Sequence, residues 1–377
     1  MPTKRILITG GAGFIGCNAA RYFGAQNWNV TVLDNLSRVG TDKNLAWLND
    51  GTTFDFVRAD VRDQARIDRV LAETRFDAVL HLAAQVAVTS SVADPRTDFD
   101  VNALGTFNVL DGLRRHCPAA VFIFASTNKV YGKTAAATCE LRGNRYAYVD
   151  RPFGIGEGEP LEFLSPYGCS KGSADQYALD FARIYQIPAT SFRQSCVYGP
   201  RQFGVEDQGW VAWFAIASML GRDITIYGDG KQVRDVLHVD DLLRAYEAAI
   251  RAPDKVARQA FNIGGGPGQL LSLLDLIEML EDRLGRPIPL RWDDWRPGDQ
   301  LVYVSDIRKL DTTLGWKPQI DVKAGVTQLM DWVGQNRADF QISGATMQDP
   351  PMSGDDVRGL LVANSERFRG RGLAETT

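Results

Sequence analysis

Residues 5–16 read Arg-Ile-Leu-Ile-Thr-Gly-Gly-Ala-Gly-Phe-Ile-Gly, a short apolar run that leads into glycines and then into a helix-like stretch through Phe23. A strand, a glycine turn and a helix in this order are typical of a unit that binds a dinucleotide. Gly10 permits the tight turn, Gly13 lets the backbone approach a pyrophosphate, and Gly16 lets the helix pack closely on the sheet. The helix N-terminus would then face the phosphate charge. A glycine pattern alone is a weak signal, so the rest of the chain must support it.

The second strand-like run, residues 30–33, ends in Asp34. An acid at this place in a dinucleotide-binding unit accepts hydrogen bonds from the adenosine ribose, and its charge repels the 2′-phosphate of NADP. The sequence therefore predicts NAD as the cofactor. Arg38 is close enough to leave NADP open, although its guanidinium could instead stack on adenine.

Further strand-like runs alternate with helical stretches at 53–57, 63–73, 78–82, 97–116 and 121–125. This alternation predicts an α/β fold with a doubly wound parallel sheet, a Rossmann domain. Ligands bind such a sheet at the carboxyl ends of its strands, so residues that follow the strands are candidates for the cofactor site. Asp60 could equally be an ordinary loop residue, and Asn102 could bond either the helix backbone or a cofactor-side loop.

A second motif, Ser-Pro-Tyr-Gly-Cys-Ser-Lys at residues 165–171, reads as the first turns of a helix with Ser165 as its N-cap. Tyr167 and Lys171 are four residues apart and therefore share one face of that helix. An ammonium near a phenol favours the phenolate, so Tyr167 could act as a base near neutral pH. By itself, this spacing is more often a helix surface with a solvated lysine. Thr127 follows the strand at 121–125, at the same sheet edge, and is the expected third catalytic group.

Composition changes along the chain predict two domains and a tail. Residues 133–164 are polar and rich in glycine and proline, which predicts a long irregular loop. We expect a Rossmann domain at 1–193, with segments at about 233–264 returning to it, and a smaller substrate-binding domain at 194–232 and 265–337. The returning segments include the expected strands Val233–Leu237 and Phe261–Gly264. Residues 338–377 lose periodicity and read as a polar tail that is either disordered or packed on a partner subunit.

The composition of the 377-residue chain indicates a globular protein, because 45% of its residues are hydrophobic. Its 42 basic and 46 acidic residues leave a net charge of -4, which predicts no general attraction to nucleic acid or to a membrane surface. Residues 1–20 contain neither a signal-peptide core nor a spanning helix, so we expect a soluble cytoplasmic protein. Five scattered cysteines and three histidines predict no disulfide framework and no metal site.

These motifs together resemble the extended short-chain dehydrogenase/reductase family of nucleotide-sugar epimerases and dehydratases, over residues 4 to about 335. Longer stretches narrow the resemblance to epimerases that act at C2 of a CDP-hexose: 34–38, 126–132, 165–172, 174–177, 199–203, 207–210 and 230–238. The resemblance implies a two-domain fold, tightly bound NAD, a nucleotide-sugar substrate and a homodimer or homotetramer. It also implies a place in deoxysugar and lipopolysaccharide O-antigen biosynthesis.

The motifs and the resemblance imply three sets of site residues. The catalytic set is Tyr167, Lys171 and Thr127. The cofactor set is Gly10, Gly13, Phe14, Ile15, Gly16, Asp34, Asn35, Ser37, Arg38, Asp60, Val61, Leu82, Ala83, Ala84, Asn102, Ala125, Tyr167 and Lys171. The substrate set is Thr127, Asn128, Arg201, Gln202, Arg234, Arg296 and Asp299.

Two departures from the family pattern bear on the reaction. Dehydratases of this family follow the catalytic threonine with an Asp-Glu pair, whereas Thr127 is followed by Asn128 and Lys129, so dehydration is not expected. C4-epimerases often carry an asparagine where Cys196 stands. The run at 127–129, together with residues 199–203, matches the pattern of the C2-epimerases, so we expect inversion at C2 through a transient ketone, with C4 epimerisation of a UDP-hexose as the alternative. A non-catalytic NAD-binding regulator is less consistent with the Tyr167 and Lys171 pair.

Overall fold

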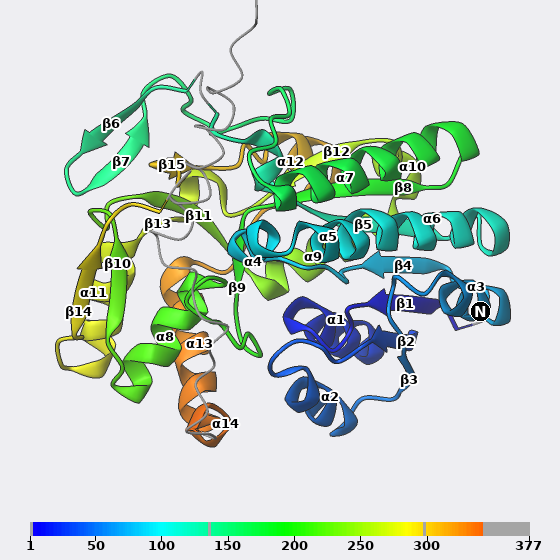
Figure 1. Cartoon of the computed structure of the whole chain (residues 1–377), viewed down its shortest axis with the longest axis horizontal. Helices are drawn as coiled ribbons and strands as arrows, with labels where there is room; N and C mark the ends of the chain where they lie inside the picture. Colours follow the sequence, from blue (N-terminus) through cyan, green and yellow to red (C-terminus); the bar gives the residue numbers. More distant parts are fainter. Residues whose placement is uncertain (1–2, 135–136, 297–298, 342–377) are drawn as a thin grey trace, which may run out of the picture.

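A seven-stranded parallel sheet forms the centre of the larger part of the molecule (Figure 1). The computed structural model describes residues 3–134, 137–296 and 299–341. Its strands follow the order β12-β8-β5-β4-β1-β2-β3, and neighbours are parallel. They are β1 (Arg5–Thr9), β2 (Asn29–Asp34), β3 (Phe54–Arg58), β4 (Ala78–His81), β5 (Val121–Thr127), β8 (Ala189–Gln194) and β12 (Ala260–Ile263). The predicted doubly wound α/β fold is confirmed.

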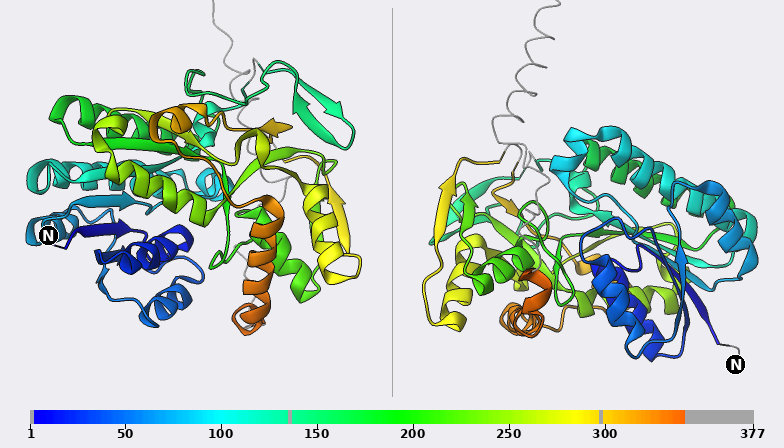
Figure 2. Two further views of the ribbon diagram at one scale, coloured as in Figure 1. Left: turned by 180° about the vertical axis from the view of Figure 1, so that it is seen from behind. Right: turned by 60° about the horizontal axis from the view of Figure 1, so that its bottom comes forward.

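Helices cover both faces of this sheet, as the right-hand view of Figure 2 shows. Side chains along β1 explain the two layers, because Ile6 and Ile8 pack into one core and Leu7 into the other. The first core is covered by α1 (Phe14–Ala25), α2 (Thr41–Asn49), α9 (Val239–Arg251), α10 (Pro253–Val256) and α12 (Arg308–Leu314). The second is covered by α3 (Gln64–Glu73), α6 (Gly105–His116) and α7 (Pro166–Tyr185). The carboxyl ends of the strands are left open to a ligand.

The single helix expected near 97–116 is divided into shorter pieces. After α4 (Val88–Ala93) come α5 (Pro95–Phe99), a π-helical turn η1 (Asp100–Leu104) and α6. Helical structure was correctly expected here, but the sequence does not distinguish an α-helical turn from a π-helical one.

The smaller part of the molecule has its own core, built on short strands and three long helices. The strands β9 (Cys196–Tyr198), β11 (Val233–His238), β13 (Leu270–Ser272) and β15 (Val302–Tyr303) form one mixed sheet, and β10 (Ile224–Tyr227) pairs with β14 (Leu290–Asp293). The helices are α8 (Trp210–Leu220), α11 (Leu273–Leu284) and α13 (Val322–Gln335). The expected strand at 233–237 therefore belongs to the smaller sheet. The chain returns to the large sheet at α9, α10 and β12, and again at α12.

Residues 133–164, expected as an irregular loop, contain a β-hairpin formed by β6 (Cys139–Arg142) and β7 (Arg145–Tyr148). Two tyrosines of β7 explain why it is ordered: Tyr146 Oη donates to Asp229 Oδ2 at 2.8 Å, and Tyr148 Oη donates to the Val302 carbonyl at 2.9 Å. Both partners lie far along the chain. The expectation of an irregular loop was thus wrong for this part of it.

The described chain ends in a short helix, α14 (Arg337–Gln341), whose Phe340 packs on Phe203 and Trp332 with ring centroids 5.2 and 5.4 Å apart. The first residues of the expected tail are therefore helical, and residues 342–377 lie outside the described residues. Among the described helices, none has the length and apolar character needed to cross a bilayer.

Candidate active site

The glycine turn after β1 has the close packing that a dinucleotide cradle requires. Gly10 has a φ of +67°, and a Cβ there would lie 2.7 Å from the backbone nitrogen of Ala83. A Cβ on Gly16 would lie 2.2 Å from the carbonyl oxygen of Gly10, so this glycine packs the helix against the turn itself. Gly13 is the N-cap of α1, and no side chain caps that helix. The N–H groups of its first turn, which lack partners within the helix, remain available to an anion.

Asp34 holds this turn at the end of β2. Its buried carboxylate accepts the backbone N–H of Ala12 at 3.0 Å and that of Leu36 at 2.8 Å. Burial raises the pKa of Asp34, and the two N–H groups act against that rise. A carboxylate has more acceptor positions than these two bonds use, so Asp34 retains capacity for a ribose hydroxyl.

Other residues of the expected cofactor set surround the turn in different ways. Asn35 donates to Asp60 at 2.9 Å, and Arg62 forms an ion pair with Asp60 at 2.8 Å that lowers the pKa of Asp60 to about 2. Arg38 donates to Gln208, which belongs to the opposite wall of the crevice. Asp60 thus already has protein partners, as expected for an ordinary loop residue.

The hydrogen bonds of Asn102 favour a structural role over a direct contact with the cofactor. Its amide bonds both the N–H and the carbonyl of Gln85, at 2.9 and 3.0 Å, and it also contacts Asp98 and Ser170. These bonds fix the loop after β4 onto α5 and α7. Asn102 therefore acts on the cofactor side of the crevice indirectly, by holding the loop that follows β4.

The three expected catalytic residues converge at the carboxyl end of β5. As predicted, Ser165 caps α7 by accepting the N–H of Gly168 at 3.1 Å, and Pro166 occupies its first turn. Tyr167, on that first turn, and Thr127, the last residue of β5, line the same cavity of about 230 Å³. Lys171 lies one turn further along α7 and is buried.

The electrostatics of the pair differ from the expectation. Burial raises the pKa of Tyr167 to about 12, and the hydrogen bond from Thr127 only partly opposes this rise. The Lys171 ammonium donates to the Ala125 carbonyl at 2.5 Å and lies 4.2 Å from the Phe124 ring centroid. Burial lowers the pKa of Lys171 to about 7. In the protein alone, Lys171 therefore does not lower the pKa of Tyr167, because its charge is directed toward β5.

The expected substrate residues fall into two groups. Arg234 forms an ion pair with Asp299 at 2.6 Å, and Arg296 pairs with Asp207 at 3.1 Å while stacking on Tyr227 at 4.0 Å. Gln202 lines the cavity, and among the described residues its buried Oε1 has no hydrogen-bond partner. These groups have capacity for a polar ligand.

Arg201 does not belong with them. Its guanidinium donates to Asn44 Oδ1 and to the Lys43 carbonyl, both at 3.0 Å, and lies between Trp47 and Trp332. Because the side chain is buried in these contacts, it ties the smaller part of the molecule to α2. The structure thus gives no support to its assignment as a substrate ligand.

Sequence reasoning missed part of the cavity wall. Ser195, Val197 and Trp210 line it beside Cys196, and Lys129 lies near Cys196. The tryptophan-rich run after residue 203 was the available signal.

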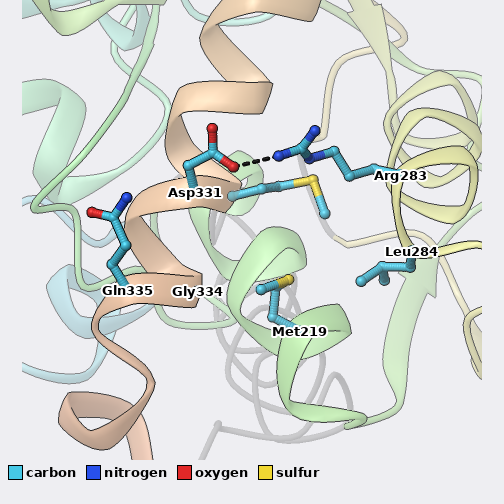
Figure 3. Close-up of a pocket in the computed structure, with 7 residues that line it drawn as sticks. Met219, Arg283, Leu284, Asp331, Gly334 and Gln335 are labelled. Carbon is cyan, nitrogen blue, oxygen red and sulfur yellow. Dashed lines mark hydrogen bonds and ion pairs between the residues drawn. The ribbon is translucent and has the colours of Figure 1, made fainter.

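A separate hollow of about 420 Å³ lies between α8, α11 and α13, where Arg283 and Asp331 form an ion pair (Figure 3). It contains none of the expected site residues.

The described residues fit a dinucleotide. The glycine turn closely approaches the loop after β4, the first turn of α1 is uncapped, and Asp34 lies beside both. Phe14 and Ile15 of α1 also line the catalytic cavity. The glycine turn and the expected catalytic residues therefore lie in one crevice.

Comparison with known proteins agrees with this geometry. Residues 6–264 match the model of the NAD dependent epimerase/dehydratase family. The chain is 43% identical over 335 residues to a CDP-paratose 2-epimerase of Salmonella typhi, covering 87% of this chain and 98% of that protein. A solved UDP-glucose 4-epimerase of Thermotoga maritima, with UDP-glucose, is 31% identical with a TM-score of 0.75, covering 88% and 99% of the two chains. A dTDP-glucose 4,6-dehydratase of Streptomyces venezuelae, with NAD bound, is 30% identical with a TM-score of 0.76, covering 89% and 98%.

Proposed function

Because this chain belongs to the NAD dependent epimerase/dehydratase family, we propose that it is a nucleotide-sugar epimerase that inverts C2 of a CDP-hexose of the paratose and tyvelose type. The observation that carries the proposal is the 43% identity to a CDP-paratose 2-epimerase across nearly the whole of that protein. The meeting of Tyr167 and Thr127 in one cavity supports a catalytic role for this chain.

The cofactor of this family is NAD, and residues around the crevice would hold it. The glycine turn and the first turn of α1 suit the pyrophosphate, Asp34 the adenosine ribose and Lys171 the nicotinamide ribose. When bound, NAD supplies a reversible hydride acceptor, so that oxidation of a sugar carbon and its later reduction leave no net redox change.

Tyr167 would act as the base that takes the proton from the sugar hydroxyl and later returns it. Thr127 would hydrogen-bond the reacting oxygen, and the ketone would turn within the cavity to present its other face. Since burial raises the pKa of Tyr167 to about 12, this role needs positive charge nearby. The Lys171 ammonium, released from the Ala125 carbonyl to a ribose hydroxyl, would supply part of it.

The substrate would occupy the opposite wall of the crevice. Arg234 and Arg296 suit the diphosphate, because guanidinium groups bind phosphate oxygens in pairs. Asp299 suits the nucleotide ribose, while Asn128 and Gln202 suit sugar hydroxyls. Each arginine is paired with a carboxylate, so a bound diphosphate would share or displace an existing partner.

Epimerisation at C4 of a UDP-hexose is the second candidate, favoured by the likeness to a solved UDP-glucose 4-epimerase. Dehydration has less support, because Asn128 and Lys129 follow Thr127 and neither is a carboxylic acid.

A homodimer is the assembly we propose, through α6 and α7. Tyr177, Ile184 and Tyr185 are each 45–49% exposed on α7, and Phe107 of α6 contacts the Tyr177 ring at 5.8 Å. An exposed aromatic and aliphatic row of this kind suits a second copy of the same surface. Light scattering on the purified protein tests this proposal.

We also propose that the enzyme acts in the cytoplasm, in the synthesis of deoxysugars for lipopolysaccharide O-antigen.

The activity is tested with a CDP-hexose that carries deuterium at C2, with products read by NMR. We expect inversion at C2 with the label retained, because the hydrogen leaves and returns as hydride. Solvent hydrogen at C2 would instead mean enolisation of a neighbouring ketone and would refute the mechanism. Inversion of a UDP-hexose at C4 alone would favour the second candidate.

A further inference from the structure

Lys129 is a charged residue that the proposed chemistry leaves without a role. It lies in the short 3₁₀ turn η2 (Asn128–Tyr131), two residues after Thr127. Its backbone N–H donates to Thr127 Oγ1 at 3.3 Å. Its carbonyl oxygen lies 3.3 Å from the place where a Cβ on Gly168 would stand, next to Tyr167 at the start of α7. The backbone of Lys129 is therefore fixed between two catalytic groups.

The side chain of Lys129 lies near Arg234 of β11 and near Asp299, both in the smaller part of the molecule. Its ammonium is close enough to Arg234 and Asp299 for their charges to interact, and burial, together with the charge of Arg234, lowers the pKa of Lys129. No acceptor within the described part of the chain hydrogen-bonds its ammonium. Asp299 already accepts Arg234 at 2.6 Å.

The neighbouring carboxylate, Asp235, does not offset the positive charge of Lys129. Asp235 is fully buried, and it accepts the hydroxyl of Ser195 at 2.5 Å and the N–H of Gly266 at 3.1 Å. Two cations thus share the one carboxylate of Asp299. An excess of positive charge in a partly buried place is unfavourable until an anion joins it.

The reaction proposed above, on which this step rests, places an anion there. C2 of the sugar is bonded to C1, which carries the diphosphate, whereas C4 lies on the far side of the ring. Presenting C2 to Tyr167 and Thr127 therefore requires the sugar-proximal phosphate to lie closer to these residues than presenting C4 does. A cation next to Thr127 that is shared with Arg234 meets this requirement.

We propose that Lys129 binds the sugar-proximal phosphate of the CDP-hexose and so determines that C2, not C4, meets the catalytic residues. Lysine suits the place because its ammonium is a compact charge on a long stem and can follow a phosphate whose sugar turns during the reaction. Arg234 holds the same diphosphate from the other side.

Binding of CDP and of CMP to the NAD-loaded protein separates this phosphate from the rest of the nucleotide, because only CDP carries the sugar-proximal one. In titration calorimetry we expect Lys129→Met to weaken CDP binding about ten- to a hundredfold, the loss of one charge-assisted hydrogen bond, and to leave CMP binding within about twofold. Lys129→Arg should recover part of the loss. Lys133→Met, which removes an exposed lysine four residues further on, should behave as the parent protein.

Retained NAD and an unchanged melting temperature show that a variant is folded, and Lys129→Gln is the second uncharged variant if Lys129→Met fails that test. An unchanged preference for CDP over CMP in a folded, uncharged variant would overturn the inference. A protein that shows the expected CDP and CMP affinities but does not invert C2 would refute the proposed function while leaving the phosphate site in place. In NMR assays with a CDP-hexose, we expect Lys129→Met to invert C2 much more slowly than the parent protein, although the variant still binds NAD.

Discussion

Replacing Lys171 by methionine should remove a strong pH dependence of stability from the cofactor-free protein. Lys171 is 3% exposed, and burial lowers its pKa from 10.5 to about 7. Between these values the unfolded chain binds a proton that the folded chain does not, so stability rises with pH across this window. At about 1.36 kcal/mol for each pKa unit, the full effect is about 5 kcal/mol.

Urea unfolding of the nucleotide-stripped protein at pH 7, 8 and 9 measures this effect. Relative to Lys171→Met, the parent protein should gain roughly 2 to 3 kcal/mol of unfolding free energy between pH 7 and pH 9. Lys133→Met, at an exposed lysine, should follow the parent at every pH. A constant difference between the parent and Lys171→Met would refute the reasoning, because it would mean that Lys171 keeps an ordinary pKa in its buried place.

Three further changes test the site. Tyr167→Phe should lower turnover about a hundred- to ten-thousandfold, the usual contribution of a general base, while mass spectrometry of the denatured protein still finds NAD; a near-normal rate would exclude Tyr167 as the base. Arg234→Ala or Arg296→Ala should weaken CDP binding by roughly one to three kcal/mol in calorimetry without displacing NAD, and unchanged affinity in both would move the diphosphate elsewhere. Gly16→Ala should abolish NAD binding, because its Cβ would lie 2.2 Å from the Gly10 oxygen, whereas Gly158→Ala, with no neighbour within 4 Å, should leave the cofactor in place.

The sequence was most informative where local chemistry alone determines the structure. The strand, turn and helix around Gly10, and the capped start of α7 at Ser165, depend on residues a few positions apart, and both lie where the motifs predicted. The proximity of Thr127 and Tyr167 could be predicted because the carboxyl ends of parallel strands lie at one edge of the sheet. The hairpin β6–β7 could not be predicted, since its order depends on Asp229 and other partners far along the chain.

Electrostatics were harder to predict than position. The spacing of Tyr167 and Lys171 shows that they share a helix face. It does not show that the ammonium is bound to the Ala125 carbonyl or that burial raises the pKa of the phenol. A pKa depends on every group around the site, whereas a motif records only two of them. The expected lowering of the pKa of Tyr167 was therefore an inference about a complete site made from a part of it.

Arg201 shows how the two walls of the crevice are kept in register. An arginine in a loop after a strand of the smaller sheet resembles a phosphate ligand in sequence, yet its donors are used on Asn44 and Lys43 of α2. Close by, Asn18 of α1 donates to the Pro200 carbonyl at 3.0 Å, so the helix that begins at the glycine turn also holds this loop. Gln202, the next residue after Arg201, lines the catalytic cavity. The wall that faces the sugar is thus anchored through Arg201 and Asn18 to the part that would hold NAD, and the reacting groups can keep their separation through a reaction in which only the substrate has to turn.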